Sequence, residues 1–238
     1  MEIELFKKPK KGAVIIQGFP GFGLVSTITT EFLIDHLKAV PIGRFSSDKI
    51  PAIAAIHKGD VIDPFGVFYD EKENIIIIRA IASIDKLEKE IIDAIIKMKK
   101  DIGAKELISI EGISSTKGTM KPKEMETFYF TSDKEKAKRF EKLGIKELEE
   151  GIIVGVTALL LREAKESSFI FSESYSELPD SRAAAKVIAV LDKYLGLDVD
   201  FKPLLAKAEK FEGKIKDILT KGEEFSKEKY DQDAGYVG

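Results

Sequence analysis

The chain contains no cysteine and only two histidines, His36 and His57. The absence of cysteine excludes disulfides, thiol chemistry and thiolate metal sites. Two histidines leave almost nothing for a zinc site or for an enzyme with a histidine base. We therefore predict that the protein uses no metal and no cofactor.

The sequence also lacks long apolar runs and a charge excess of one sign. No stretch of about 18 apolar residues occurs, and no basic segment followed by an apolar one opens the chain, so neither a membrane span nor a signal peptide is expected. Lys and Arg number 38 against 41 Asp and Glu, which gives a net charge of -3. Nucleic-acid binding needs a concentrated basic face. We expect a cytoplasmic protein that binds neither nucleic acid nor membrane.

Amide side chains are scarce as well, with one asparagine (Asn74) and two glutamines (Gln17 and Gln232) among 238 residues. Charged residues make up 33% of the chain, and Lys and Glu dominate them. Few thermolabile amides beside many ion-pairing side chains are typical of proteins from hyperthermophiles. This pattern indicates a thermophilic source and carries no information about activity.

The chain alternates short apolar runs with amphipathic stretches. Residues 13–17, 107–110 and 169–171 read as buried strands, and residues 24–38, 83–102 and 180–195 read as helices. Residues 65–69 and 75–79 flank a polar connection and predict a hairpin. Such alternation predicts an α/β fold with an open, mainly parallel sheet and helices on both faces. We expect residues 1–200 to form this core domain.

Several boundaries follow from local chemistry. Ser83 and Asp180 are expected to cap the helices that end at Gly103 and Gly196. Ser132, with Glu135 three residues later, predicts a capping box for a short helix that ends at Gly144. Residues 151–156 predict another strand, followed by a helix over residues 158–165. Residues 112–123 read as a polar loop.

The C-terminal part has a different pattern, and we expect a helical extension over residues 201–229 and a flexible tail over residues 230–238. Its apolar residues are spaced alternately by four and three, which is typical of a narrow heptad seam. Gly222 interrupts the seam, whose members are Leu204, Ala208, Phe211, Ile215, Ile218 and Phe225. The seam either packs along its own domain or joins subunits of a homo-oligomer.

A possible ligand loop lies where a glycine-rich turn joins the first buried strand to its helix. Gly21 and Gly23 resemble the start of a dinucleotide-binding turn, but its third glycine and the P-loop lysine are both missing. A second polar loop with Ser114, Ser115 and Thr116 follows a strand, where open α/β sheets bind ligands. A small-molecule or nucleotide-binding enzyme is therefore the alternative hypothesis. Tight turns and ordinary loops explain the same residues.

The remaining catalytic candidates are weak. No nucleophile elbow occurs, and no serine has an evident histidine partner. His36 falls on an inward-looking helical face, and His57 reads as a turn residue at a strand end. Glu111 and Glu173 follow strands, but the sequence alone does not bring them together. We predict that the protein is not an enzyme.

Three segments resemble the proteasome assembly chaperone family. They read QGFPGFGLV at residues 17–25, GIIVGVTALL at residues 151–160 and LPDSRAA at residues 178–184, the last followed by LDVD at residues 197–200. They occur in the order that the family shows. The resemblance to the family extends over about residues 10–220.

The resemblance implies a phosphorylase/hydrolase-like α/β core and a homo-oligomer. It also implies a protein that assists assembly of the proteasome core particle or binds its α-ring without ATP. The segment that binds the α-ring in such proteins is often a C-terminal hydrophobic-Tyr-X tail. Its aromatic ring and carboxylate enter a pocket between ring subunits. The corresponding residues here are Tyr236, Val237 and Gly238. Tyr236 is third from the end, so the carboxylate lies roughly 3.5 Å further from the ring than in that motif.

Overall fold

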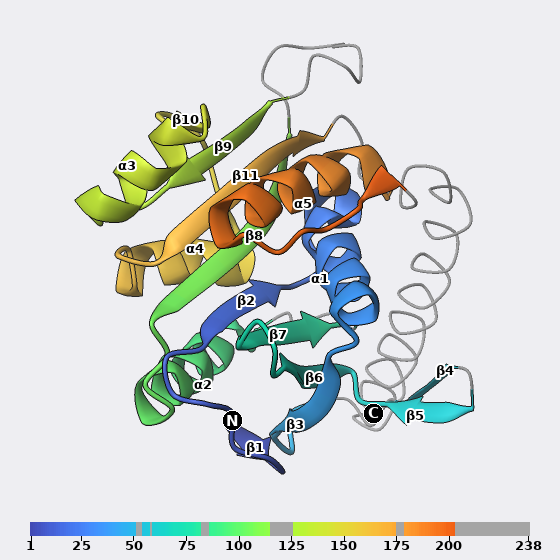
Figure 1. Cartoon of the computed structure of the whole chain (residues 1–238). Coiled ribbons are helices and arrows are strands. Elements are labelled where there is room, and N and C mark those ends of the chain that lie inside the picture. The colour runs from blue at the N-terminus through green and yellow to red at the C-terminus, as the bar shows by residue number, and fades with distance from the viewer. Residues whose placement is uncertain (51–53, 58, 82–85, 115–125, 175–178, 203–238) are drawn as a thin grey trace, which may run out of the picture.

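The computed structural model describes residues 1–50, 54–57, 59–81, 86–114, 126–174 and 179–202 (Figure 1). Several predictions fall outside these residues. They are the seam, the tail with Tyr236, Val237 and Gly238, and the loop residues Ser115 and Thr116.

A nine-stranded open sheet forms the centre of the molecule. In spatial order its strands are β1 (Glu2–Leu5), β3 (Val40–Ser46), β6 (Phe65–Asp70), β7 (Ile75–Ala80), β2 (Val14–Gly18), β8 (Glu106–Ser114), β11 (Ser168–Ser174), β9 (Thr127–Phe130) and β10 (Lys146–Glu147). The four central strands β7, β2, β8 and β11 run parallel, and antiparallel pairings join β1, β3 and β6 on one side and β9 on the other. The predicted open α/β sheet with a parallel centre is confirmed.

Helices cover both faces of this sheet, as predicted. On one face α1 (Val25–Leu37) packs against α5 (Ser181–Leu195), with α3 (Lys134–Lys142) beside them (Figure 1). On the other face α2 (Glu88–Asp101) packs against α4 (Gly155–Glu163). We call the two layers the α1/α5 face and the α2/α4 face.

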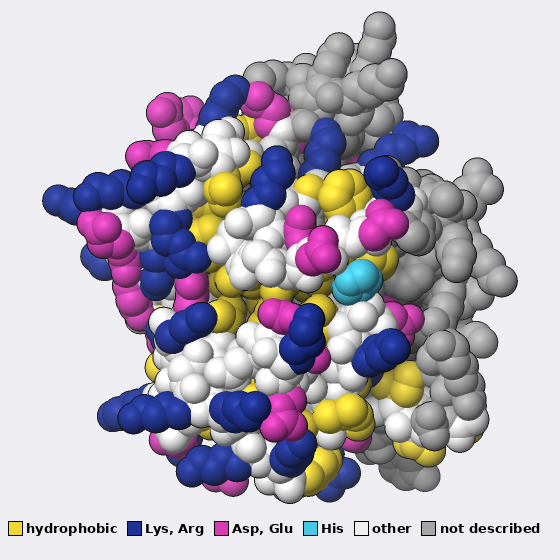
Figure 2. Space-filling model, in the orientation of Figure 1, with side chains coloured by type: hydrophobic (Ala, Val, Ile, Leu, Met, Phe, Trp, Pro, Cys, Tyr) yellow, Lys and Arg dark blue, Asp and Glu magenta, His cyan; other side chains and the backbone are white. Residues whose placement is uncertain are grey.

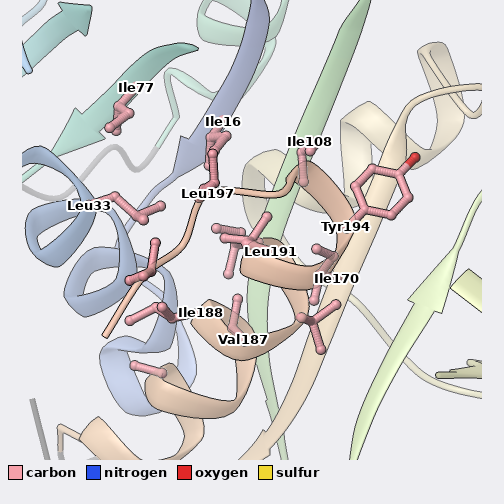
Figure 3. Packing of buried hydrophobic residues seen from close by; sticks show 14 of the residues in the cluster. Ile16, Leu33, Ile77, Ile108, Ile170, Val187, Ile188, Leu191, Tyr194 and Leu197 are labelled. Atoms are coloured by element: carbon pink, nitrogen blue, oxygen red, sulfur yellow. The ribbon is translucent and has the colours of Figure 1, made fainter. Parts of the chain in front are cut away.

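The central strands are buried on both sides, which explains their nearly continuous apolar sequences. In β2, Val14 and Ile16 face α1 and α5, whereas Ile15 faces α2 and α4. Figure 3 shows Ile16, Ile77, Ile108 and Ile170 from four neighbouring strands packed beneath helix residues of the α1/α5 face such as Leu191. The isoleucine-rich strands thus supply both halves of the core.

A separate two-stranded hairpin is formed by β4 (Ala55–His57) and β5 (Asp60–Ile62). Ile56 and Val61 are directly paired across it, and both side chains are mostly exposed. Within the described parts of the chain, no helix combines the length and the apolar character needed to cross a membrane.

Some helix starts differ from the prediction. Helix α3 is capped by Asp133, whose carboxylate accepts hydrogen bonds from the amides of Glu135 and Lys136, and the predicted cap Ser132 lies one residue earlier. Helix α2 begins at Glu88, later than expected, and Ser83 lies outside the described residues. Asp180 caps α5, and Gly196 in the left-handed region (φ 73°) ends it, so both predictions are confirmed.

Two strand predictions also need correction. Residues 112–114 extend β8, so the polar loop begins later than predicted. Residues 151–154 form no strand, and α4 already begins at Gly155, which has a φ of +69°. Apolar β-branched residues favour a strand, but a strand also needs a neighbour to pair with. A short 3₁₀ turn, η1 (Phe22–Leu24), precedes α1.

Candidate functional site

The carboxyl ends of β2 and β8 form the switch point of the sheet, where ligands bind in many open α/β proteins. From β2 the chain continues through α1 toward β3, whereas from β8 it continues toward β9 and β11 on the other side. The glycine-rich turn of residues 18–23 lies at this point. The predicted ligand glycines Gly21 and Gly23 are therefore at the expected place in the fold.

The turn is packed tightly against the strand ends. A Cβ atom added to Gly112 in β8 would lie 1.9 Å from the carbonyl oxygen of Phe22. A Cβ atom on Gly21 would lie 2.0 Å from Oε1 of Glu111, and one on Gly23 would lie 2.5 Å from Oγ of Ser174. These glycines are needed because backbone and side chains approach each other closely.

The start of α1 offers no open cradle for a phosphate group. Val25, Ser26 and Thr27 in its first turn are completely buried, and the Ser26 hydroxyl donates to the carbonyl oxygen of Phe19. Phosphate binding at a helix start needs accessible amides and no competing anion. Here the Glu111 carboxyl already lies against Gly21. Among the described residues, the start of α1 is covered by the protein's own chain.

Glu111 ends a chain of buried hydrogen bonds that links β2, β8 and α4. The Gln17 amide donates to the Ser109 hydroxyl, which lies 3.2 Å from the Thr157 hydroxyl, and Thr157 donates to Oε2 of Glu111 over 2.9 Å. Glu111 keeps some exposed surface, but protein surrounds its carboxyl closely. Burial raises the pKa of Glu111 to about 7, although hydrogen bonds from Thr157 and the Gly112 amide oppose the shift.

A second set of contacts ties the turn to α5. The Asp180 amide donates to the carbonyl oxygen of Gly23 over 2.9 Å, and the Ser174 hydroxyl donates to Asp180 Oδ2 over 2.9 Å. The other carboxylate oxygen of Asp180 accepts from the amides of Arg182 and Ala183 and so caps the helix. The two networks bring the three sequence motifs together at one end of the sheet.

The other candidate residues lie outside these two networks, although Ser114 and Glu173 line one cavity. Ser114 is exposed at the end of β8. Glu173 lies on the strand next to Glu111, but its carboxylate accepts from the amide of Glu126, so the two glutamates have different partners. The side chain of His36 is exposed and stacks on Phe32, which corrects the predicted inward orientation. Among the described residues, no three His, Asp or Glu side chains are arranged to hold a metal ion.

Sequence reasoning missed a buried ion pair at the end of β7. Arg79 donates from Nη1 to Glu31 Oε2 over 2.9 Å, and both side chains are more than nine-tenths buried. The Arg79 guanidinium also lies over the ring of Phe68, at 4.6 Å from its centroid. Forty-eight residues separate the two partners, so no local pattern indicates the pair.

An acidic cavity of about 540 Å³ lies beside β9 and β10. Its lining has six glutamates and a single lysine, Lys146; the glutamates are Glu126, Glu141, Glu147, Glu149, Glu150 and Glu173. The α1/α5 side differs, since Figure 2 shows basic and acidic side chains interspersed over it without a large area of one sign.

A model of the PAC2 family matches residues 15–219, which span all three motifs and nearly the whole described structure. The chain belongs to the PAC2 family. The packed turn, the Thr157–Glu111 contact and the Asp180 cap are thus features of a PAC2-family protein, and they explain why its three motifs meet.

Among solved structures, Pyrococcus furiosus PbaA, an archaeal homolog of proteasome-assembly chaperone, is 33% identical to this PAC2-family chain. The match has a TM-score of 0.84 and covers 93% of this chain and 98% of PbaA. Pyrococcus furiosus PbaB, an archaeal proteasome activator, is 22% identical with a TM-score of 0.72 over 91% of this chain and 97% of PbaB, and shares the fold. An uncharacterised protein of Methanocaldococcus jannaschii is 26% identical over 220 residues, 91% of this chain and 89% of its own.

Proposed function

We propose that this protein is an archaeal, cytoplasmic proteasome assembly chaperone or ATP-independent activator that binds the α-ring of the 20S core particle as a homo-oligomer. The observation that carries the proposal is the similarity to PbaA, which extends over almost the full length of both chains. A TM-score of 0.84 over this length indicates that the two chains share the whole α/β fold.

The geometry of the glycine-rich turn does not favour binding of a small molecule at the start of α1. The place where a ligand would enter is occupied by the turn of residues 18–23, and the Glu111 carboxyl lies where a phosphate would have to approach. Ligands of open α/β proteins often bind in a crevice at that position. The acidic cavity of the described surface lies beside β10, and Ile113, Ser114 and Glu173 at the carboxyl ends of β8 and β11 also line it.

We propose that the tail of residues 231–238 is the segment that binds the core particle. The aromatic ring of Tyr236 would fill a pocket between α-ring subunits, and the carboxylate of Gly238 would pair with a lysine there. Several tails on one oligomer would act together on a symmetric ring, so each tail needs only modest affinity.

Size-exclusion chromatography of the purified protein with a 20S core particle tests the proposal. We expect co-elution for the full chain and its loss, or a large reduction, when residues 231–238 are deleted or when Tyr236→Ala is introduced. Unchanged co-elution of both variants would disprove the tail mechanism. No co-elution of the full chain with core particles from related archaea would disprove the proposed partner.

A thermal-shift screen with nucleotides tests the alternative enzyme hypothesis. A ligand that binds only the folded state raises the free energy of unfolding by mass action, by about 2.7 kcal/mol at a hundredfold excess over its Kd. We expect no nucleotide to shift the melting temperature. Clear stabilisation by one nucleotide would instead favour a ligand-binding function.

A further inference from the structure

The segment between β10 and α4 exposes two large apolar side chains. Ile152 is 93% exposed and Val154 is 75% exposed, whereas Ile153 between them packs against the core of the α2/α4 face. The segment has the composition of a strand, but no strand of the described structure pairs with it. The two β-branched side chains at alternate positions form a small apolar surface on which a partner can pack.

Acidic side chains that have no ion-pair partner among the described residues lie directly before this apolar pair. Glu147, Glu149 and Glu150 are exposed and line the 540 Å³ cavity, and we call these three residues the acidic rim. Lys146 is paired with Glu126 over 2.6 Å. Within the described ranges, no cation lies within ion-pair distance of the rim. A partner for this surface must therefore offer both apolar and basic groups.

The C-terminal seam has this combination. When Leu204 and Phe211 are placed at the d positions of a heptad, every g position is a lysine: Lys207, Lys214 and Lys221. A row of lysines would then run along one side of the apolar stripe, with about 10 Å between successive members. The acidic rim spans roughly 10 Å from Glu147 to Glu150, which matches the spacing of two successive lysines in the row.

Chain connectivity favours a second copy as the source of the seam, because the chain leaves the described structure after Phe201 on the other face of the sheet. Phe201 packs on the α1/α5 face, and Leu204 follows only three residues later, within about 11 Å. Ile152 and Val154 belong to the segment that packs on the α2/α4 face. The two outer layers lie on opposite sides of the sheet, roughly 20 Å apart, since each layer packs about 10 Å from it. A second copy can present the whole seam.

We propose that the acidic rim, together with Ile152 and Val154, binds the Leu204–Phe225 seam of a second copy of this chain. The inference rests on the homo-oligomer of the proposed function and identifies the surface that accepts the seam. The two contact surfaces differ, so the contact is heterologous, and successive copies close into a ring when the rotation between them allows it. Such a ring would carry several tails at once.

Charge reversal, followed by measurement of the oligomer mass with light scattering, tests the proposal. The triple change Glu147→Lys, Glu149→Lys and Glu150→Lys should weaken self-association about tenfold or more, and so should Lys207→Glu with Lys214→Glu and Lys221→Glu. The two sets combined in one chain should restore the mass. Failure of the combined variant to associate would overturn the proposal.

Two double variants test whether self-association depends on Ile152 and Val154 in particular and not on exposed apolar residues in general. Ile152→Glu with Val154→Glu should shift the mass toward that of one chain, 26.5 kDa. The matched control, Ile56→Glu with Val61→Glu, alters two similarly exposed residues on the β4–β5 hairpin and should leave the oligomer intact. An unchanged mass for the first pair would refute the proposal.

Parallel binding to the 20S core particle keeps the two proposals distinguishable. A wild-type chain that binds the core particle as a monomer would defeat the inference and leave the proposed partner intact. An oligomer that responds to charge reversal as described, but does not bind the core particle, would defeat only the proposed function. If the lysine variants lowered the melting temperature without any change in mass, the seam would pack on its own chain and the inference would be wrong.

Discussion

Replacing Glu111 by glutamine should make the protein less sensitive to rising pH. The Glu111 carboxyl lies at the switch point against Gly21 and accepts a hydrogen bond from Thr157. Glutamine has nearly the same shape, and its carbonyl oxygen can accept the same bond, but it cannot ionise. The variant therefore removes the buried charge with little change in packing.

The magnitude follows from the pKa of this carboxyl. Burial raises it from 4.5 to about 7, so the folded state holds the proton more tightly than the unfolded state. Below pH 4.5 both states are protonated and the shift costs nothing. As pH rises from 4.5 to about 7, the free energy of unfolding falls, and above that range a penalty of about 3 kcal/mol is fully present. Because Glu111 keeps some exposed surface, this figure is an upper value.

The assay is denaturant unfolding of both proteins across a pH series, followed by far-ultraviolet circular dichroism. The difference in unfolding free energy, variant minus wild type, should grow by about 2.5 kcal/mol between about pH 5 and pH 8. Titration of other groups cancels in this difference. Glu2→Gln, a change at an exposed carboxyl of β1, controls for the altered net charge.

A second variant checks the cause of the shift. Thr157→Val removes the hydroxyl that donates to Glu111 and opposes its raised pKa, so the stability of this variant should fall more steeply with pH than that of the wild type. If Glu111→Gln and wild type lost stability in parallel across the series, the carboxyl would not be buried as described, and the reasoning about the filled switch point would fail.

Other substitutions probe the contacts that position the turn and the helices, with unfolding free energies as the measurement. Gly112→Ala should lower the free energy of unfolding by about 3 kcal/mol, because its Cβ would lie 1.9 Å from a backbone carbonyl oxygen. The control Gly151→Ala, whose Cβ would lie 3.5 Å from the nearest atom, should change stability little. Equal effects of the two substitutions would contradict the packing described for Gly112. Glu31→Gln should cost about 3–5 kcal/mol by leaving the buried Arg79 charge uncompensated, and a loss below about 1 kcal/mol would argue against that pair. Asp180→Ala should cost about 1–2 kcal/mol through loss of the α5 cap, and unchanged stability would refute this role.

The seam and the tail remain predictions from sequence, because they lie outside the described residues. The family membership was reached from the sequence through the three motifs, and the match over residues 15–219 confirms it. The motifs could be identified without the structure because each is a continuous run of residues. The contacts between the three motifs could not be inferred from the sequence in that way.

Local chemistry in the sequence determined the elements of the core. Continuous apolar runs such as residues 13–17 predict strands buried on both faces, and the Asp180 cap and the Gly196 stop bound α5 correctly. These features depend on neighbours within one or two turns of chain, so a single sequence contains them. The strand predicted for residues 151–156 is absent from the structure. Strand formation also depends on a neighbouring strand to pair with, and a single sequence does not specify that neighbour.

Only the tertiary structure decided which residues meet at the switch point. Glu111 lies against Gly21, ninety residues away in sequence, and Arg79 pairs with Glu31 because β7 and α1 become neighbours in the folded sheet. The raised pKa of Glu111 has the same origin, because burial of its carboxyl requires the turn of residues 18–23 to close over it. The order of strands in the sheet sets these distances, and that order is a property of the whole fold, which no local pattern records.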